Sequence, residues 1–260
     1  MSGLPQELID HIIDHIDHEH TLIACALVSS QWSTHSRKRL FARVELYSKE
    51  CLERWCARIP LGPSGPSPLV KGLSLFDCWH STSTLPIGEE WIQPSTISGA
   101  ASHLRSLSGL RELSIMGWNT YVLQASFMLY CVGPLPGNVT RLTLEHIFVY
   151  PSTLAMFVSH FPRLDDLSIC DVRSLGSCSP HHGFHDKIVP THPRGELNVA
   201  GVIGFRTPKE FFEAIALLEP RFREVTLAHA TWRDFWPVVE ACAGSLEVLH
   251  IVATATRAGE

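Results

Sequence analysis

The sequence predicts a mixed chain of the α+β or α/β class, in which a small three-helix unit precedes an irregular solenoid with a parallel sheet of about seven strands. Apolar residues follow helical spacing in the first forty or so positions, and a short strand motif recurs after residue 69. Helix signals stand between several copies of that motif. We therefore divide the chain into a helical unit (1–46), a linker (47–68) and the solenoid (69–260).

The composition is that of an ordinary globular protein. The 260 residues are 45% hydrophobic and 18% charged, which suits one or two domains. A net charge of −5 gives no general attraction to phosphate backbones, so we expect no nucleic-acid partner. Asp10 and Asp14 interrupt any signal peptide, and no segment approaches the apolar length of a membrane span. We expect no membrane partner and a location in the cytosol, the nucleus or both.

The helical unit is predicted from its caps and its apolar spacing. The first helix starts at Pro5, which suits an opening turn. Thr21 can cap a second helix that runs through Val28, and Ser29 or Ser30 can cap a third. The first helix carries its apolar residues on one stripe that we expect to be buried: Leu8, Ile9, Ile12, Ile13 and Ile16.

A unit of this size has a small core. Residues 42–46 alternate like a short strand and end it. About forty residues lie below the size that usually folds without a metal, disulfides or a partner. This limit favours docking onto another protein.

Three motifs in this unit carry a resemblance. They are Leu4-Pro5-x-Glu7-Leu8-x-x-x-Ile12, Ala26-Leu27-Val28-Ser29-x-x-Trp32 and Ser36-Arg37-x-x-Leu40-Phe41. In order, spacing and residue type they resemble the F-box, in a form similar to the F-box proteins abundant in mushroom-forming fungi. Ser30 and Gln31 stand where F-box proteins often have Cys or Lys and Arg, which leaves the apolar anchors untouched.

The resemblance implies binding to a Skp-type adaptor and, through it, to cullin and RING subunits. The residues it assigns to the adaptor are Leu4, Pro5, Leu8, Ile12, Leu27, Val28, Trp32, Leu40 and Phe41. The alternative is that the same residues merely fill a local three-helix core.

The predicted linker combines a helix signal with a breaker. A helix is possible around Cys51–Trp55, and the segment from Pro60 to Pro68 holds four prolines and two glycines that cannot continue regular structure.

After the linker, an apolar-x-x-apolar-x-apolar motif recurs: Val70/Leu73/Leu75, Leu110/Leu113/Ile115, Val139/Leu142/Leu144, Leu164/Leu167/Ile169, Phe222/Val225/Leu227 and Leu246/Leu249/Ile251. The double-length step before Phe222 is divided by Arg194-x-x-Leu197-x-Val199, which keeps the last two apolar positions of the motif. Successive copies are 40, 29, 25, 30, 28 and 24 residues apart. These steps are similar to those of leucine-rich repeats, roughly 20–29 residues. The Asn or Cys typical of the ninth position appears only as Cys78, which predicts a degenerate form.

Helix signals between the copies favour strand and helix in alternation. Thr207 to Glu210 form a capping box that opens a helix through Leu218. Further helices are expected from Ser152 or Thr153 to His160, and from about Pro237 to Ala243, with Gly244 as a left-handed cap. Strands joined this way pair in parallel, with right-handed connections, in a curved solenoid. The chain ends nine residues after Ile251 without an obvious polar capping repeat, which leaves room for a longer protein.

Motifs for chemistry are few. His11 and His15 have metal-ligand spacing on a helix, but we favour a solvated polar face, opposite the apolar stripe, as their explanation. The loop from Cys178 to Asp186 gathers His181, His182 and His185 and is the best support for a third hypothesis, a zinc enzyme or hydrolase. Its spacing fits no known zinc finger, the eight cysteines form no CxxC pair, and the GxSxG and phosphate-loop motifs are absent. We expect no catalytic residue, no metal and no cofactor.

Substrate recognition falls to the predicted sheet. Residues interleaved with the buried strand positions would line the opposite face, and several Trp residues follow strands. The candidates are Phe76, Met116, Trp118, Glu145 and Trp232. The sequence thus predicts a substrate receptor of an SCF-type cullin–RING ubiquitin ligase that binds an unknown protein substrate. The alternative is a repeat module that binds proteins and whose F-box does not serve degradation.

Overall fold

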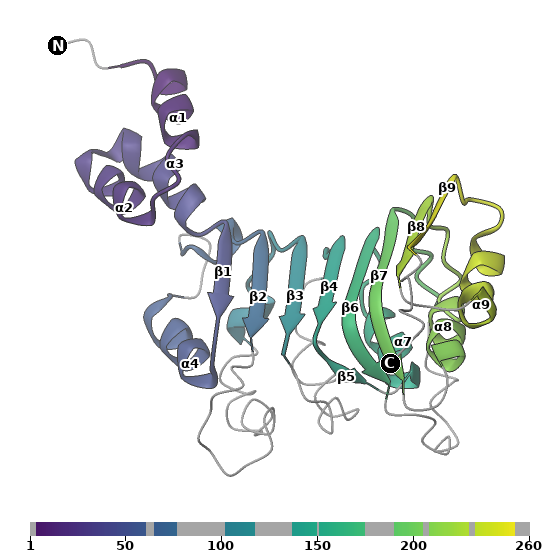
Figure 1. The fold of residues 1–260 in the computed structure, drawn as a ribbon. Helices are drawn as coiled ribbons and strands as arrows, with labels where there is room; N and C mark the ends of the chain where they lie inside the picture. Colours follow the sequence, from purple (N-terminus) through teal and green to yellow (C-terminus); the bar gives the residue numbers. More distant parts are fainter. Residues whose placement is uncertain are drawn as a thin grey trace, which may run out of the picture.

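The computed structural model describes residues 4–60, 65–76, 102–117, 137–149, 151–174, 190–204, 208–228 and 232–252. The chain begins with three helices, α1 (Gln6–Asp14), α2 (Glu19–Val28) and α3 (Ser30–Leu40). They are followed by a strand, β1 (Arg43–Leu46), a helix, α4 (Lys49–Arg58), and a short 3₁₀ turn, η1 (Ser67–Leu69). Figure 1 shows the three helices at one end of a long sheet, next to β1.

The caps of these helices explain where they start. Pro5 occupies the N-cap of α1, so the helix begins one residue after the predicted start at Pro5. Ser29 Oγ accepts a hydrogen bond from the Trp32 backbone N–H at 3.5 Å, so Ser29 and not Ser30 caps α3. The predicted start of α2 at Thr21 was wrong, because the helix already begins at Glu19, with His18 at its cap. Glu19 lies in the first turn of α2, where its negative charge interacts favourably with the positive end of the helix dipole. This interaction stabilises a helix that starts at Glu19.

The strands of the described residues form one parallel sheet. After β1 it contains β2 (Gly72–Phe76), β3 (Glu112–Met116), β4 (Arg141–Glu145), β6 (Asp166–Ser174), β7 (Glu196–Gly204), β8 (Glu224–Ala228) and β9 (Val248–Val252). Their order in the sheet is their order in the chain, and every pair is parallel. The two-residue β5 (Phe148–Val149) pairs with β6 beside this path. The predicted parallel sheet is confirmed.

The register of the strands confirms the alignment of the repeated motif. Its fourth residue forms one row across the sheet: Leu73, Leu113, Leu142, Leu167, Leu197, Val225 and Leu249. All seven predicted strands are present. Val44 pairs with Leu73 in the same row, so β1 adds an eighth strand to the sheet's main path.

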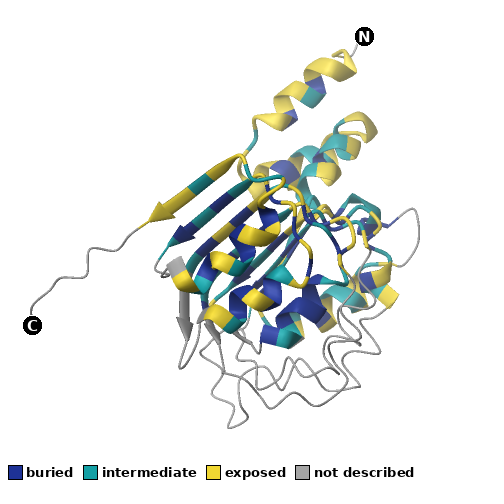
Figure 2. Ribbon diagram, turned by 90° about the vertical axis from the view of Figure 1, so that its right-hand side faces the viewer, coloured by how far each residue is buried: buried dark blue, intermediate teal, exposed yellow. Residues whose placement is uncertain are grey.

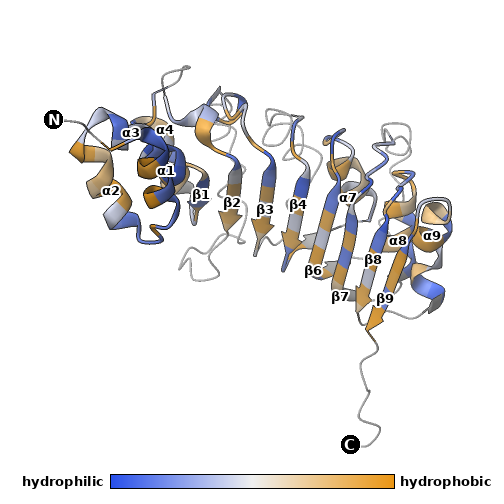
Figure 3. Ribbon diagram, turned by 90° about the horizontal axis from the view of Figure 1, so that it is seen from above, coloured by the Kyte–Doolittle hydropathy of each residue, from blue (hydrophilic) through white to orange (hydrophobic). Residues whose placement is uncertain are grey.

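Helices cover one face of the sheet. They are α4, α7 (Pro151–Val158), α8 (Pro208–Ala216) and α9 (Trp232–Cys242), and Figure 3 shows α7, α8 and α9 on one side of the strands. Within the described ranges, no helix is long and apolar enough to cross a membrane.

The last of these helices differs from its prediction. Pro237 lies inside α9 instead of opening it. Phe235, Val238 and Val239 are buried on both sides of the proline, and this burial offsets the hydrogen bond that Pro237 cannot donate. Gly244 is not in the left-handed conformation that we expected of it; among the described glycines, Gly117 has a positive φ.

A single apolar core runs under the length of the sheet. Strand residues alternate between buried and half-buried, as in β3 and β8. The motif's inward residues from β2 to β8 are at most 9% exposed. Leu46 of β1 and Leu52 of α4 belong to the same core, so part of the segment that we placed in a linker packs against the sheet. Figure 2 shows this burial along the strands and its loss at β9.

Candidate adaptor-binding face

The three N-terminal helices enclose a core of their own. Ile9, Ile13 and Leu22 are its buried residues, and both α1 and α2 pack against α3. Ile16, Trp32 and Leu40 are partly buried against this core. A core of this size buries little apolar surface, in agreement with the limit expected for so short a unit.

Most of the unit's other large apolar side chains point outward. On the α1 side, Leu4, Leu8 and Ile12 follow one another at every fourth residue and are about half exposed. On α2, Ile23 is similarly exposed, and Leu27 and Val28 reach 82% and 69%. The stripe that we expected to be buried therefore divides: Ile9 and Ile13 face inward, whereas Leu8 and Ile12 face outward. Our prediction that the whole stripe is buried was wrong.

The predicted adaptor-binding residues fall into two groups. Leu4, Pro5, Leu8, Ile12, Leu27 and Val28 are exposed, so a local core does not account for them. Trp32 and Leu40 contact the small core, and Phe41 is half-buried at the C-cap of α3. These last three residues therefore support the position of α3, whatever else they contact. We call the exposed residues Leu4, Leu8, Ile12, Ile23, Leu27 and Val28 the apolar face.

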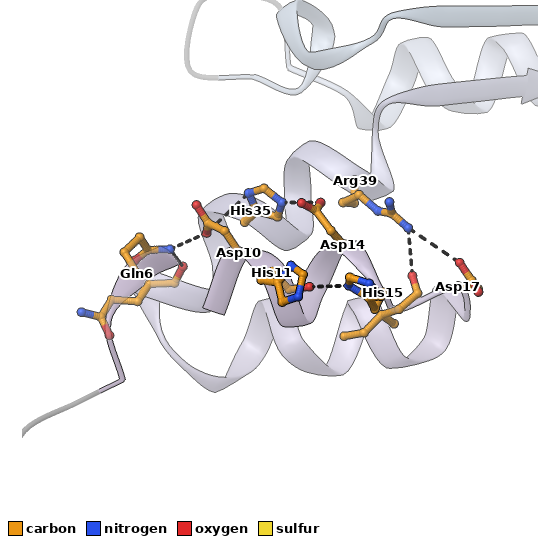
Figure 4. Close-up of polar contacts among 10 residues, drawn as sticks. Gln6, Asp10, His11, Asp14, His15, Asp17, His35 and Arg39 are labelled. Atoms are coloured by element: carbon orange, nitrogen blue, oxygen red, sulfur yellow. Dashed lines mark hydrogen bonds and ion pairs between the residues drawn. The ribbon is translucent and has the colours of Figure 1, made fainter. Parts of the chain in front are cut away.

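Polar contacts hold α1 on α3. His35 Nε2 lies 2.8 Å from Asp14 Oδ1, and His35 Nδ1 lies 3.5 Å from Asp10 Oδ1 (Figure 4). Arg39 Nη2 donates to the Ile16 carbonyl at 3.1 Å, just beyond the end of α1. Asp10 and Asp14 are two residues further along α1 than Leu8 and Ile12, a rotation of about 200°. Asp10 and Asp14 therefore face α3, whereas Leu8 and Ile12 face away from it.

The pairing has an electrostatic consequence. The hydrogen bond from His35 is the largest cause that lowers the pKa of Asp14, and the charges of Arg39 and His15 act in the same direction. The sequence alone did not reveal this pair. Asp10 and Asp14 lie four residues apart in the sequence, but the imidazole that meets them is 21 residues away from Asp14.

The histidines with metal-ligand spacing lie on α1. The rings of His11 and His15 are 4.5 Å apart, and His15 Nδ1 donates to the His11 carbonyl at 2.8 Å. One nitrogen of His15 is therefore already used by the helix. Over the residues that the structure describes, no three His, Cys, Asp or Glu side chains are placed to hold a metal ion. The Cys178–Asp186 loop lies outside those residues.

Three of the predicted substrate-binding residues share one row of the sheet. Phe76, Met116 and Glu145 are neighbours on β2, β3 and β4. Phe76 also stacks on Tyr47, with ring centroids 4.7 Å apart. Trp118 lies outside the described residues, and Trp232 is the first residue of α9.

A comparison with protein families identifies the N-terminal unit. Residues 1–43 match the F-box domain, and no curated protein matches the chain. F-box domains serve in general as the adaptor part of SCF-type ubiquitin ligases and typically bind Skp-type adaptors. The match ends at the first residue of β1, where the helical unit passes into the sheet. The chain therefore carries an F-box domain at its N-terminus and is an F-box protein.

Proposed function

We propose that this chain is the substrate-receptor subunit of an SCF-type cullin–RING ubiquitin ligase. Its F-box binds a Skp-type adaptor, which links it to cullin and RING subunits, and its sheet domain binds a protein substrate. The chain itself is not an enzyme in this proposal; it acts in the cytosol, the nucleus or both. Its contribution is to raise the effective concentration of a substrate lysine near the ubiquitin thioester.

The observation that carries this proposal is the apolar face. Its six side chains are aliphatic and between 42% and 82% exposed, on a unit whose own core has three buried residues. Large apolar side chains that are exposed together on so small a unit indicate an interaction site. Covering a half-exposed aliphatic side chain contributes about 1 kcal/mol. The set can therefore supply several kcal/mol of binding free energy to a partner.

The junction between the F-box and the sheet suits a receptor. Two residues, Phe41 and Ala42, separate α3 from β1. The Ala42 carbonyl accepts hydrogen bonds from the backbone N–H groups of Lys71 and Gly72 at 2.8 and 2.9 Å. The F-box thus passes directly into the parallel ladder and is not tethered by a long loop. A fixed connection favours a defined distance between adaptor and substrate, which is what catalysis by proximity requires.

Charged side chains strengthen the same junction. Arg43 Nη2 of β1 lies 3.1 Å from Glu112 Oε2 of β3, and Arg141 of β4 pairs with the other carboxylate oxygen. Arg43 reaches Glu112 across Gly72, where an added Cβ would lie 3.2 Å from Arg43 Cγ. These ion pairs therefore link β1, β3 and β4, across β2, on the face opposite the helices.

That open face is the surface that we propose for the substrate. Its middle row carries short polar side chains in register: Ser74, Ser114, Thr143, Ser168, Asn198 and Thr226. The next row supplies Phe76, Met116 and Glu145. Small side chains allow another chain to approach the sheet closely, and the aromatic stack of Tyr47 and Phe76 offers an apolar anchor at the F-box end.

The test is co-expression of the full chain with a Skp-type adaptor, followed by affinity measurement. Leu8→Ala/Leu27→Ala removes two exposed side chains and should weaken the complex on the order of a hundredfold. Leu217→Ala is the matched control, because Leu217 is a comparably exposed leucine outside the F-box. Equal binding by all three proteins would overturn the assignment of the apolar face.

A second step distinguishes the ligase from the alternative module. The complex of chain and adaptor should retain a cullin subunit in a pull-down. A stable adaptor complex that excludes cullin would contradict a role in ubiquitin transfer, and would favour an F-box that serves only stability or regulation.

A further inference from the structure

The apolar face is divided between two helices. Three of its side chains belong to α1 or to the residues just before it, and three belong to α2: Leu4, Leu8 and Ile12, and Ile23, Leu27 and Val28. Each of these helices packs on α3. The position of α1 on α3 therefore sets the distance between the two halves of the face, and a partner that covers both halves requires that position to be fixed.

The helix α1 is weak by itself. It has nine residues, and isolated helices shorter than about 12–15 residues are marginal in water. Asp10 and Asp14 stand four residues apart on it, a spacing at which like charges repel each other. Asp14 is also the last residue of α1, next to the negative end of the helix dipole. The helix thus depends on contacts with other parts of the F-box.

His35 of α3 lies between these two carboxylates. Its Nε2 is 2.8 Å from Asp14 Oδ1, and its Nδ1 is 3.5 Å from Asp10 Oδ1 (Figure 4). An imidazole that is protonated on both nitrogens has a donor for each carboxylate. The His35 side chain is 20% exposed, so it is largely enclosed by the two helices. The ring turns a repulsive pair on α1 into an attraction that exists only when α1 is docked on α3.

Two further polar contacts extend this attraction along the pair of helices. At the start of α1, Gln6 Nε2 donates to the Gln31 carbonyl of α3 at 3.4 Å. Beyond its end, Arg39 Nη2 donates to the Ile16 carbonyl at 3.1 Å. His35 lies between these two contacts along α3, and it is the one that meets charged partners on α1 from both ring nitrogens.

We infer that His35 is a positioning residue for adaptor binding. It holds α1 on α3, through Asp10 and Asp14, so that the two halves of the apolar face lie at the distance that the adaptor requires. A binding surface that is fixed before association loses less conformational freedom in the complex. This inference rests on the proposed function for the identity of the partner, and on the contacts between α1 and α3 for the role of His35.

The affinity for a Skp-type adaptor measures the first consequence. The full-length His35→Ala variant should bind the adaptor roughly fivefold more weakly than the wild-type chain, a factor that allows for the exposure of the two carboxylates. Thr34→Ala is the matched control, because Thr34 is exposed on α3 and its hydroxyl donates to the Ser30 carbonyl of the same helix. Equal affinities for His35→Ala and the wild-type chain, or equal losses in the two variants, would overturn the inference.

A double-mutant cycle with Asp14 tests whether the charge pairing carries the effect. Asp14→Ala should weaken adaptor binding more in the wild-type chain than in His35→Ala. In the latter, Asp14 has lost its partner and its charge is only unfavourable at the end of the helix. The two factors should differ roughly threefold or more. The same factor in both backgrounds would mean that His35 does not act through this carboxylate, and would contradict the inference.

Amide hydrogen exchange of the free chain separates positioning from a general structural role. In His35→Ala the amides of α1 should exchange several times faster, whereas those of α2 should keep their wild-type rates, because α2 packs on α3 independently of His35. Faster exchange in all three helices would point to general unfolding and count against the inference. A wild-type chain that binds no adaptor would sink the proposed function, whereas α1 amides that do not respond to His35→Ala would sink the inference alone.

Discussion

The F-box and the sheet domain distribute their apolar residues in opposite ways. In the sheet, the inward residues of β2 to β8 are at most 9% exposed and form one continuous core. In the F-box, three apolar residues are buried and six large aliphatic side chains are exposed. Both regions show the regular apolar spacing typical of a buried face. The difference shows that the spacing of apolar residues in the sequence predicts which residues share a face. Whether the chain itself buries that face depends on the size of the folded unit.

The largest expected effect tests this division directly. Leu167→Ala removes a side chain that is 1% exposed at the centre of the sheet, and should lower the free energy of unfolding by about 2–5 kcal/mol. Leu27→Ala removes one that is 82% exposed and should change it by less than about 0.5 kcal/mol. Chemical denaturation measures both. In the adaptor-binding assay, Leu27→Ala should weaken binding more than Leu167→Ala does. A large loss of stability from Leu27→Ala would mean that the apolar face belongs to a core.

A smaller effect probes the packing of the sheet's turns. A Cβ on Gly109 would lie 2.4 Å from the Pro68 carbonyl oxygen and 3.0 Å from that of Val70. These are backbone atoms that cannot move freely, so Gly109→Ala should destabilise the chain by about 1–3 kcal/mol. Gly244→Ala is the control, since nothing lies within 4 Å of its added Cβ. Equal melting temperatures for the two variants would show that the turn before β3 is looser than the structure indicates.

The smallest effect concerns the F-box, where polar contacts supplement a minimal core. Because the pKa of Asp14 is lower in the folded chain than its ordinary value of 3.8, the paired carboxylate stabilises the F-box above that pH. This contribution is lost as the pH falls through the lowered pKa of the folded state. The Asp14 carboxyl carbon, followed by NMR, should titrate below 3.8 in the wild-type chain and closer to it in His35→Ala. Unchanged titration in the variant would exclude His35 as the main cause.

Local patterns predicted much of the fold. The recurring motif predicted all seven of its strands and their common register, because one buried face requires the same period in each strand. The F-box motifs predicted the domain that the family comparison identified over residues 1–43. Helix ends were less reliable. We misplaced the start of α9 because proline usually stands at the start of a helix. Here the burial of Phe235 and Val238 outweighs that preference, and Pro237 lies inside the helix.

By itself the sequence determined the order of elements, the parallel sheet and the F-box, since each depends on spacing or on residues close in the chain. Only the tertiary structure decided which half of the α1 stripe is buried, how His35 meets Asp14, and that the strand ending the F-box region is the first strand of the sheet. The physical reason is common to all three: burial and pairing depend on which distant segment arrives next to a residue, and that neighbour is absent from any local pattern.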